Sequence, residues 1–75
     1  MTIRGQQPCW FGPGESYGLE SYISDTKKVE LLGIGSVDGW YVIMNPYFHQ
    51  PCWVAADAVE LDPAMDISVF PTITP

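Results

Sequence analysis

The chain has 75 residues, a mass of 8.3 kDa and a formal net charge of −6, from 9 acidic and 3 basic residues. A chain of this length forms one small domain. Three basic residues cannot neutralise a run of phosphates, so the composition excludes nucleic acid and anionic membranes as partners. No stretch approaches the roughly 20 apolar residues of a membrane-spanning helix, and no charged-then-apolar signal pattern opens the chain.

Short apolar runs separated by 7 Gly and 7 Pro dominate the chain, and no segment has a clean helical period. This pattern predicts an all-β fold. Residues 15–27 have spaced apolar positions among small and polar ones, which predicts a long ordered loop. Turn signals at Gly12-Pro13-Gly14 and Asp38-Gly39 delimit neighbouring strands. We expect five short strands in a small barrel, at residues 7–11, 28–33, 40–44, 52–55 and 59–61.

The segment after Leu61 differs in composition from the rest of the chain. Residues 62–75 contain Pro63, Pro71 and Pro75 among small, polar and single apolar residues. Such a composition is typical of an extended linker. The chain therefore divides into a barrel of residues 7–61 and a Pro-rich tail or linker of residues 62–75. The alternative is a terminal arm that packs Val69 and Phe70 on the barrel.

The two cysteines of the chain lie in a tripeptide that occurs twice. Pro8-Cys9-Trp10 recurs as Pro51-Cys52-Trp53, and both cysteines fall on expected strands. An even cysteine count in a small domain favours a disulfide, which indicates a location outside the cytoplasm. Two buried free thiols are one alternative. A zinc site that includes His49 is another, although zinc prefers ligands at short paired spacings and none are present.

Several motifs together resemble the bacterial SH3-like (SH3b) family, in its extracellular variety with a Cys…Cys-Trp-Val disulfide pattern. The resemblance covers residues 7–61. It implies a five-stranded SH3-like barrel with a long RT-type loop and a non-catalytic binding role. The motifs, in chain order, are Cys9-Trp10-Phe11-Gly12-Pro13-Gly14, Tyr17, Lys28-Val29-Glu30-Leu31-Leu32-Gly33, Gly39-Trp40-Tyr41-Val42-Ile43, Cys52-Trp53-Val54 and Val59-Glu60-Leu61.

The residue pattern does not favour a catalytic site or a cofactor site. The single histidine, His49, lies three residues from Cys52 across Pro51, and odd separations on a strand place side chains on opposite faces. The acidic residues are scattered, without the alternation of a calcium loop. The glycines precede no helix that could bind phosphate. We therefore expect no enzyme activity, no metal site and no cofactor.

Aromatic residues provide the most plausible binding surface. In residues 40–44, strand alternation places Trp40, Val42 and Met44 on one face and Tyr41 and Ile43 on the other. SH3-like domains bind extended ligands on exposed aromatics between two loops. By this resemblance we expect a groove rimmed by acidic residues. Its aromatic members are Tyr17, Tyr22, Trp40 and Tyr47, and its rim residues are Glu15 and Asp38.

The sequence thus favours a non-catalytic binding or targeting module within a larger secreted or cell-surface protein. Its partner would be a peptide, a cell-wall component or a protein, and the acidic balance favours a neutral or basic one. The alternative is a disulfide-stapled structural or assembly domain that mediates protein–protein contacts, with a neighbouring domain or as a homo-oligomer. The Pro-rich tail is compatible with this alternative.

Overall fold

The computed structural model describes residues 1–75 and consists of β-strands with three short 3₁₀ turns, which confirms the all-β prediction. No helical segment is long and apolar enough to cross a membrane. The strands are β1 (Thr2–Ile3), β2 (Gln7–Trp10), β3 (Leu19–Ile23), β4 (Glu30–Gly35), β5 (Trp40–Met44), β6 (Pro51–Ala55), β7 (Val59–Glu60) and β8 (Thr72–Ile73). The 3₁₀ turns are η1 (Glu15–Tyr17), η2 (Ala56–Ala58) and η3 (Ile67–Val69).

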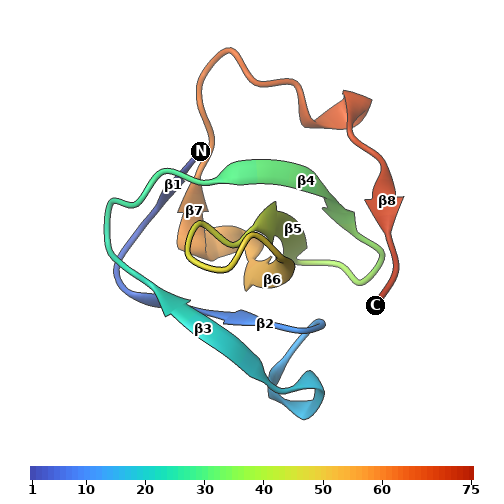
Figure 1. Ribbon diagram of the computed structural model, residues 1–75. Helices are drawn as coiled ribbons and strands as arrows, with labels where there is room; N and C mark the ends of the chain where they lie inside the picture. The colour runs from blue at the N-terminus through green and yellow to red at the C-terminus, as the bar shows by residue number, and fades with distance from the viewer.

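The strands form a curved six-stranded sheet and a separate two-stranded sheet. The large sheet has the order β3-β2-β6-β5-β4-β8, and the small one pairs β1 with β7. Figure 1 shows the strands curving around a common interior, with β3 and β8 at the two edges of the large sheet. The closed five-stranded barrel that we expected is therefore not found. Strands β1 and β8, at the two ends of the chain, add to the sheets. Each has only two residues and no alternation in sequence, so neither is among the five expected strands.

The segment expected to be a loop, residues 15–27, contains the edge strand β3. Strand β3 runs antiparallel to β2, with Gln7 opposite Ile23 and Cys9 opposite Ser21. Ile23 is the only buried residue of the strand, because β3 has a neighbour on one side alone. The register shifts between Cys9 and Trp10. An exposed, bulged edge strand lacks the period of two that sequence reasoning requires.

Residues 62–75 fold back onto the sheet, which differs from the extended linker that we expected. Strand β8 runs parallel to β4, where the Ile34 N–H donates to the Pro71 carbonyl at 2.9 Å and the Ser36 N–H to the Ile73 carbonyl at 2.9 Å. Phe70 packs partly buried against the core, whereas Val69 is 75% exposed. The tail thus satisfies donors on the edge of β4, and proline does not prevent this because its carbonyl still accepts.

The main core lies on the inner face of the curved sheet. It contains ten buried residues, namely Met1, Ile3, Cys9, Ile23, Val29, Leu31, Ile43, Cys52, Val54 and Val59. Ile43 belongs to this core, as does the partly buried Tyr41, whereas Val42 is fully buried on the opposite face. The alternation expected for β5 is therefore present, and both faces of this central strand are covered.

The two cysteines form a disulfide that joins β2 to β6. Cys9 and Cys52 have Cα atoms 5.5 Å apart, are 43 residues apart in sequence and are fully buried. The predicted disulfide is thus confirmed, and neither free thiols nor thiolate ligands remain. A disulfide is consistent with an extracellular location.

Candidate binding face

Tryptophan side chains cover the outer face of the sheet. Trp10 and Val42 lie opposite Trp53 on its two sides, so all three side chains project from the same face. Trp40, two residues before Val42, projects from that face as well. Trp53 is almost completely buried, whereas Trp10 and Trp40 are partly exposed. On this face, two partly exposed tryptophans therefore lie on either side of a buried third.

The buried indole of Trp53 can lie close to the sheet because the residue beneath it, Gly35, has no side chain. A Cβ atom on Gly35 would lie 2.6 Å from Cζ3 of Trp53 and 2.9 Å from the carbonyl oxygen of Trp40. Both distances are shorter than real Cβ contacts. Gly35 is therefore required by close packing, and it sets the depth at which the tryptophan layer lies on the sheet.

The connection between β2 and β3 is an ordered loop that carries Tyr17. Its backbone hydrogen bonds run from the Phe11 N–H to the Gly18 carbonyl at 3.0 Å and from the Tyr17 N–H to the Gly14 carbonyl at 3.1 Å. Gly14 has a φ of 124°, which L-residues rarely adopt. The Tyr17 ring lies against Gly12, where an added Cβ would come within 2.3 Å of it. The ring is nevertheless 49% exposed, so it is ordered and accessible.

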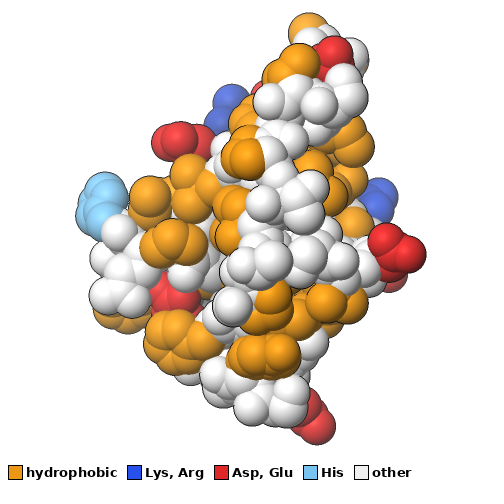
Figure 2. All heavy atoms as spheres, turned by 90° about the vertical axis from the view of Figure 1, so that its right-hand side faces the viewer, with side chains coloured by type: hydrophobic (Ala, Val, Ile, Leu, Met, Phe, Trp, Pro, Cys, Tyr) orange, Lys and Arg blue, Asp and Glu red, His pale blue; other side chains and the backbone are white.

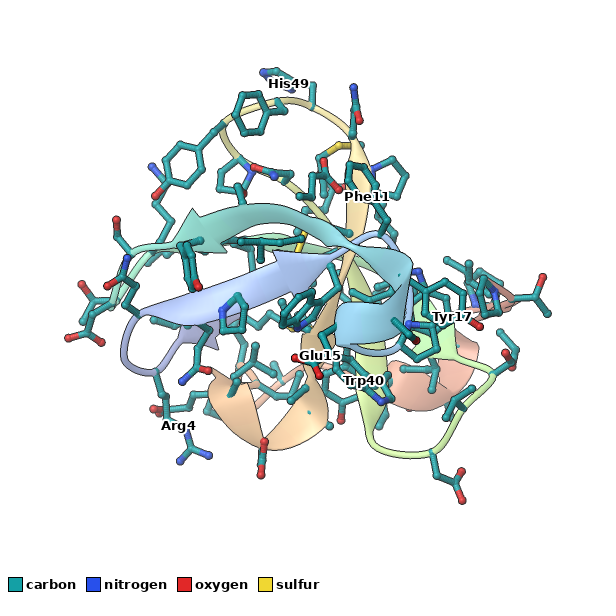
Figure 3. The ribbon with its side chains drawn as sticks, turned by 90° about the horizontal axis from the view of Figure 1, so that it is seen from below. Arg4, Phe11, Glu15, Tyr17, Trp40 and His49 are labelled. Atoms are coloured by element: carbon teal, nitrogen blue, oxygen red, sulfur yellow. A yellow bond between two sulfur atoms is a disulfide. The ribbon has the colours of Figure 1, made fainter.

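We define the aromatic face as Trp10, Tyr17 and Trp40. Figure 3 shows Glu15, Tyr17 and Trp40 toward one end of the molecule, with His49 far from them. The exposed Asp38 lies in the turn between β4 and β5, two residues before Trp40. Figure 2 shows hydrophobic side chains over the lower part of the surface that carries β8, with acidic side chains at its margin. Four of the predicted residues, namely Glu15, Tyr17, Asp38 and Trp40, therefore belong to this end.

Only one of the other two predicted tyrosines lies on the outer face. Tyr22 is exposed and lies opposite Pro8, two residues before Trp10, so strand alternation projects it from the same face as Trp10, beside the aromatic face. Tyr47 lies on the β5–β6 hairpin, where its hydroxyl donates to Oγ of Ser24 at 3.1 Å and accepts from the Ser24 N–H at 3.3 Å. Trp10 is the member of the face that our sequence reasoning omitted. Its position opposite Trp53, visible only from the register, places it there.

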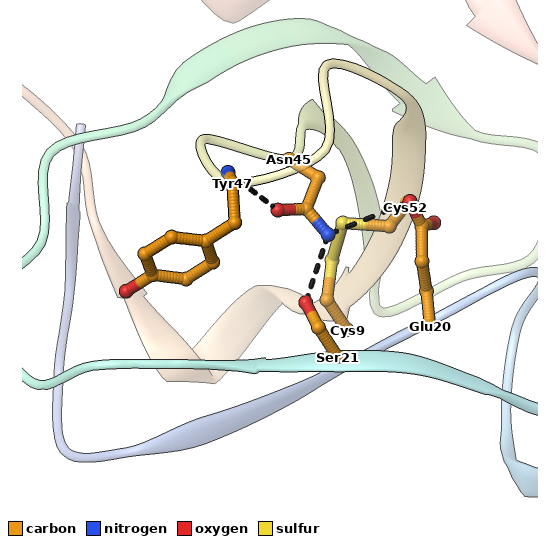
Figure 4. The surroundings of a disulfide bond; sticks show 6 residues. All are labelled: Cys9, Glu20, Ser21, Asn45, Tyr47 and Cys52. Atoms are coloured by element: carbon orange, nitrogen blue, oxygen red, sulfur yellow. Dashed lines mark hydrogen bonds between the residues drawn. A yellow bond between two sulfur atoms is a disulfide. The ribbon is translucent and has the colours of Figure 1, made fainter.

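The β5–β6 hairpin tip, residues 45–50, is held by the fully buried Asn45. Figure 4 shows this side chain between the tip and β3, close to the disulfide. Its Nδ2 donates to Oγ of Ser21 at 2.8 Å and to Oε1 of Glu20 at 3.4 Å, and its Oδ1 accepts from the Tyr47 N–H at 2.9 Å. The backbone closes the loop with the His49 N–H on the Asn45 carbonyl at 3.0 Å. The tip is therefore a fixed structure.

The Tyr47 hydroxyl connects the hairpin tip to Ser24 by hydrogen bonds, and the Tyr47 ring lies close to a cation. Hydrogen bonds with the Ser24 side chain and backbone lower the pKa of Tyr47, and the nearby Lys27 charge adds to the effect. The Lys27 Nζ lies 5.5 Å from the centroid of the Tyr47 ring. Such a cation–π contact orders both side chains at the surface.

Glu20 is a partly buried carboxylate beneath the tip. Its Oε2 is covered and has no hydrogen-bond partner in the protein. Burial raises the pKa of Glu20 above its usual 4.5, and the hydrogen bond from Asn45 opposes the shift. Since the folded protein then holds this proton more tightly than the unfolded chain, the free energy of unfolding falls as the pH rises through the window just above 4.5.

Glu20→Gln should remove this penalty. The amide oxygen of Gln still accepts from Asn45, while the buried charge is lost. We expect the variant to be modestly more stable than the wild type at pH 7 and equal to it near pH 4. The measurement is urea unfolding of both proteins at the two pH values. Because the difference between the two proteins cancels the other titrating groups, a difference independent of pH would contradict the assignment.

No three His, Cys, Asp or Glu side chains lie close enough together to hold a metal ion, and the molecule contains no pocket. Comparison with known protein families, with curated proteins and with solved structures finds no match for the chain. The structure thus defines a small β domain with one internal disulfide and exposed aromatic side chains.

Proposed function

We propose that the chain is a non-catalytic binding module of the bacterial SH3-like kind, within a secreted or cell-surface protein. The observation that carries the proposal is the aromatic face, where Tyr17 and Trp40 are held accessible on a rigid support. Flat rings supported from beneath bind extended ligands at low entropic cost. The buried disulfide supports the location, because such bonds persist in oxidising compartments.

The chemistry of the face favours a neutral or basic ligand. Glu15 and Asp38 at the rim and the net charge of −6 repel polyanionic polymers and attract cationic groups. Basic side chains or amino groups of a peptide or a cell-wall component would stack on the rings and pair with the rim. A partner protein that presents such a segment is bound by the same contacts.

Binding to purified peptidoglycan and to short basic peptides tests the proposal. We expect retention of the wild type on one of these ligands, and a loss of about tenfold or more in affinity for Tyr17→Ala and for Trp40→Ala. Phe48→Ala, which removes an equally exposed ring at the hairpin tip, is the matched control and should bind as the wild type does. Absence of binding to both ligands by a folded wild type would reject the proposal.

A further inference from the structure

A second aromatic surface lies far from the aromatic face, on the hairpin tip. Phe48 is 57% exposed, on a tip closed by hydrogen bonds from the Asn45 N–H to the Gln50 carbonyl at 2.8 Å and from the His49 N–H to the Asn45 carbonyl at 3.0 Å. Its neighbour His49 has a φ of 53°, in the left-handed region, which is uncommon for residues other than Gly although His adopts it more often than most. Asn45 and Tyr47 hold this conformation. The chain therefore maintains a strained turn that presents a phenylalanine to solvent, and strain of this kind is typical of functional positions.

The two surfaces differ in the charges beside them, because a cation lies against the tip. Lys27, one of only 3 basic residues in the chain, lies beside the tip through its contact with Tyr47. Two acids near the tip are engaged within the protein: Asp25 Oδ1 accepts from the Gly5 N–H at 2.8 Å, and the partly buried Glu20 accepts from Asn45. The aromatic face has Glu15 and Asp38 at its rim. The tip thus presents the exposed Phe48 side chain, called the knob below, with Lys27 nearby. The aromatic face presents Tyr17 and Trp40, with Glu15 and Asp38 nearby.

We infer that the partner of the tip is the aromatic face of a second copy of this chain. Phe48 of one molecule would stack on Tyr17 and Trp40 of the next, with Lys27 facing Glu15 and Asp38. This inference rests on the proposed function, since it uses the same face as a binding surface. Figure 3 shows His49 of the tip and Trp40 of the face far apart on the molecule. A contact between unlike surfaces at separate ends is heterologous, so it builds open chains or rings of more than two copies instead of an isologous dimer.

Mixing two defective variants tests this geometry directly. Phe48→Ser removes the knob and Tyr17→Ser alters the face, and both side chains are exposed enough for the fold to tolerate the change. Each variant alone should remain a monomer. An equimolar mixture should form a dimer and stop there, because it contains one intact knob and one intact face that can meet. Val69→Ser, at a side chain that is 75% exposed elsewhere, is the control and should associate as the wild type does.

The measurement is the mass by light scattering over a concentration series up to about 1 mM, which reaches even weak association. We expect the wild-type mass to rise from 8.3 kDa without a plateau at the dimer. A wild type that stays monomeric throughout, a plateau at the dimer, or a mixture that stays monomeric would each overturn the inference. Near-ultraviolet circular dichroism confirms that every variant is folded.

Ligand binding at about 10 µM protein, where weak self-association is negligible, separates this inference from the proposed function. Peptide binding by a protein that never associates would reject self-assembly and retain the binding role. Association without affinity for peptidoglycan or basic peptides would retain the inference and reject the broader ligand proposal. In that second outcome, the chain is an assembly domain whose ligand is its own hairpin tip.

Discussion

Reduction of the Cys9–Cys52 bond should lower the free energy of unfolding by about 4 kcal/mol, from the loop entropy that a cross-link over 43 residues removes from the unfolded chain. A domain of 75 residues has about 4–11 kcal/mol of stability in total. The reduced protein should therefore populate unfolded molecules at 37 °C. Because both thiols stay buried in the same core, the expected loss comes chiefly from the cross-link and little from packing.

Urea unfolding followed by tryptophan fluorescence, with and without dithiothreitol, measures this effect. A mass increase of about 2 Da confirms that the bond has been reduced. The double variant Cys9→Ala/Cys52→Ala is the control, since its unfolding midpoint should lie below that of the oxidised wild type and should not respond to reductant. Equal midpoints for the oxidised and reduced wild type would show that the bond contributes no stability.

Strands with strong local patterns were predictable from the sequence, and edge strands were not. The strand expected at residues 40–44 matches β5 in its bounds, because both faces of Trp40–Met44 are apolar and an Asp-Gly turn precedes it. Strands β1, β7 and β8 have two residues each, and their pairing depends on partners distant in sequence. No local period can reveal a strand of two residues, and the proline-rich composition of residues 62–75 by itself favours a tail or linker.

The candidate site was predictable in composition but only partly in arrangement. Aromatic residues near the Gly12-Pro13-Gly14 turn indicated an accessible face, and Tyr17 lies there. Tyr47 was assigned to the same groove because exposed tyrosines are typical of such grooves. The structure instead engages its hydroxyl with Ser24, across 23 residues of sequence. Long-range hydrogen bonds of this kind depend on the sheet register, which composition and spacing do not determine.

Gly35→Ala should disrupt the tryptophan layer and lower the free energy of unfolding by about 2 kcal/mol. The new methyl group would lie 2.9 Å from the Trp40 carbonyl oxygen and 2.6 Å from the Trp53 ring. The carbonyl belongs to the backbone of β5, and the ring is buried, so neither moves without loss of packing. For a domain of this size, the loss corresponds to a fall of about 10 °C in Tm.

Gly33→Ala is the matched control because it tests the same strand against a different neighbour. Its methyl group would meet Ile73 at 2.5 Å and the Pro71 carbonyl at 2.7 Å, and both belong to the tail. We expect this variant to release residues 62–75 to protease while the tryptophan fluorescence stays native. Gly35→Ala should instead alter the fluorescence and weaken ligand binding to Trp40. Since the face depends on this layer, a Gly35→Ala protein with unchanged Tm and binding would contradict the assigned support of the site.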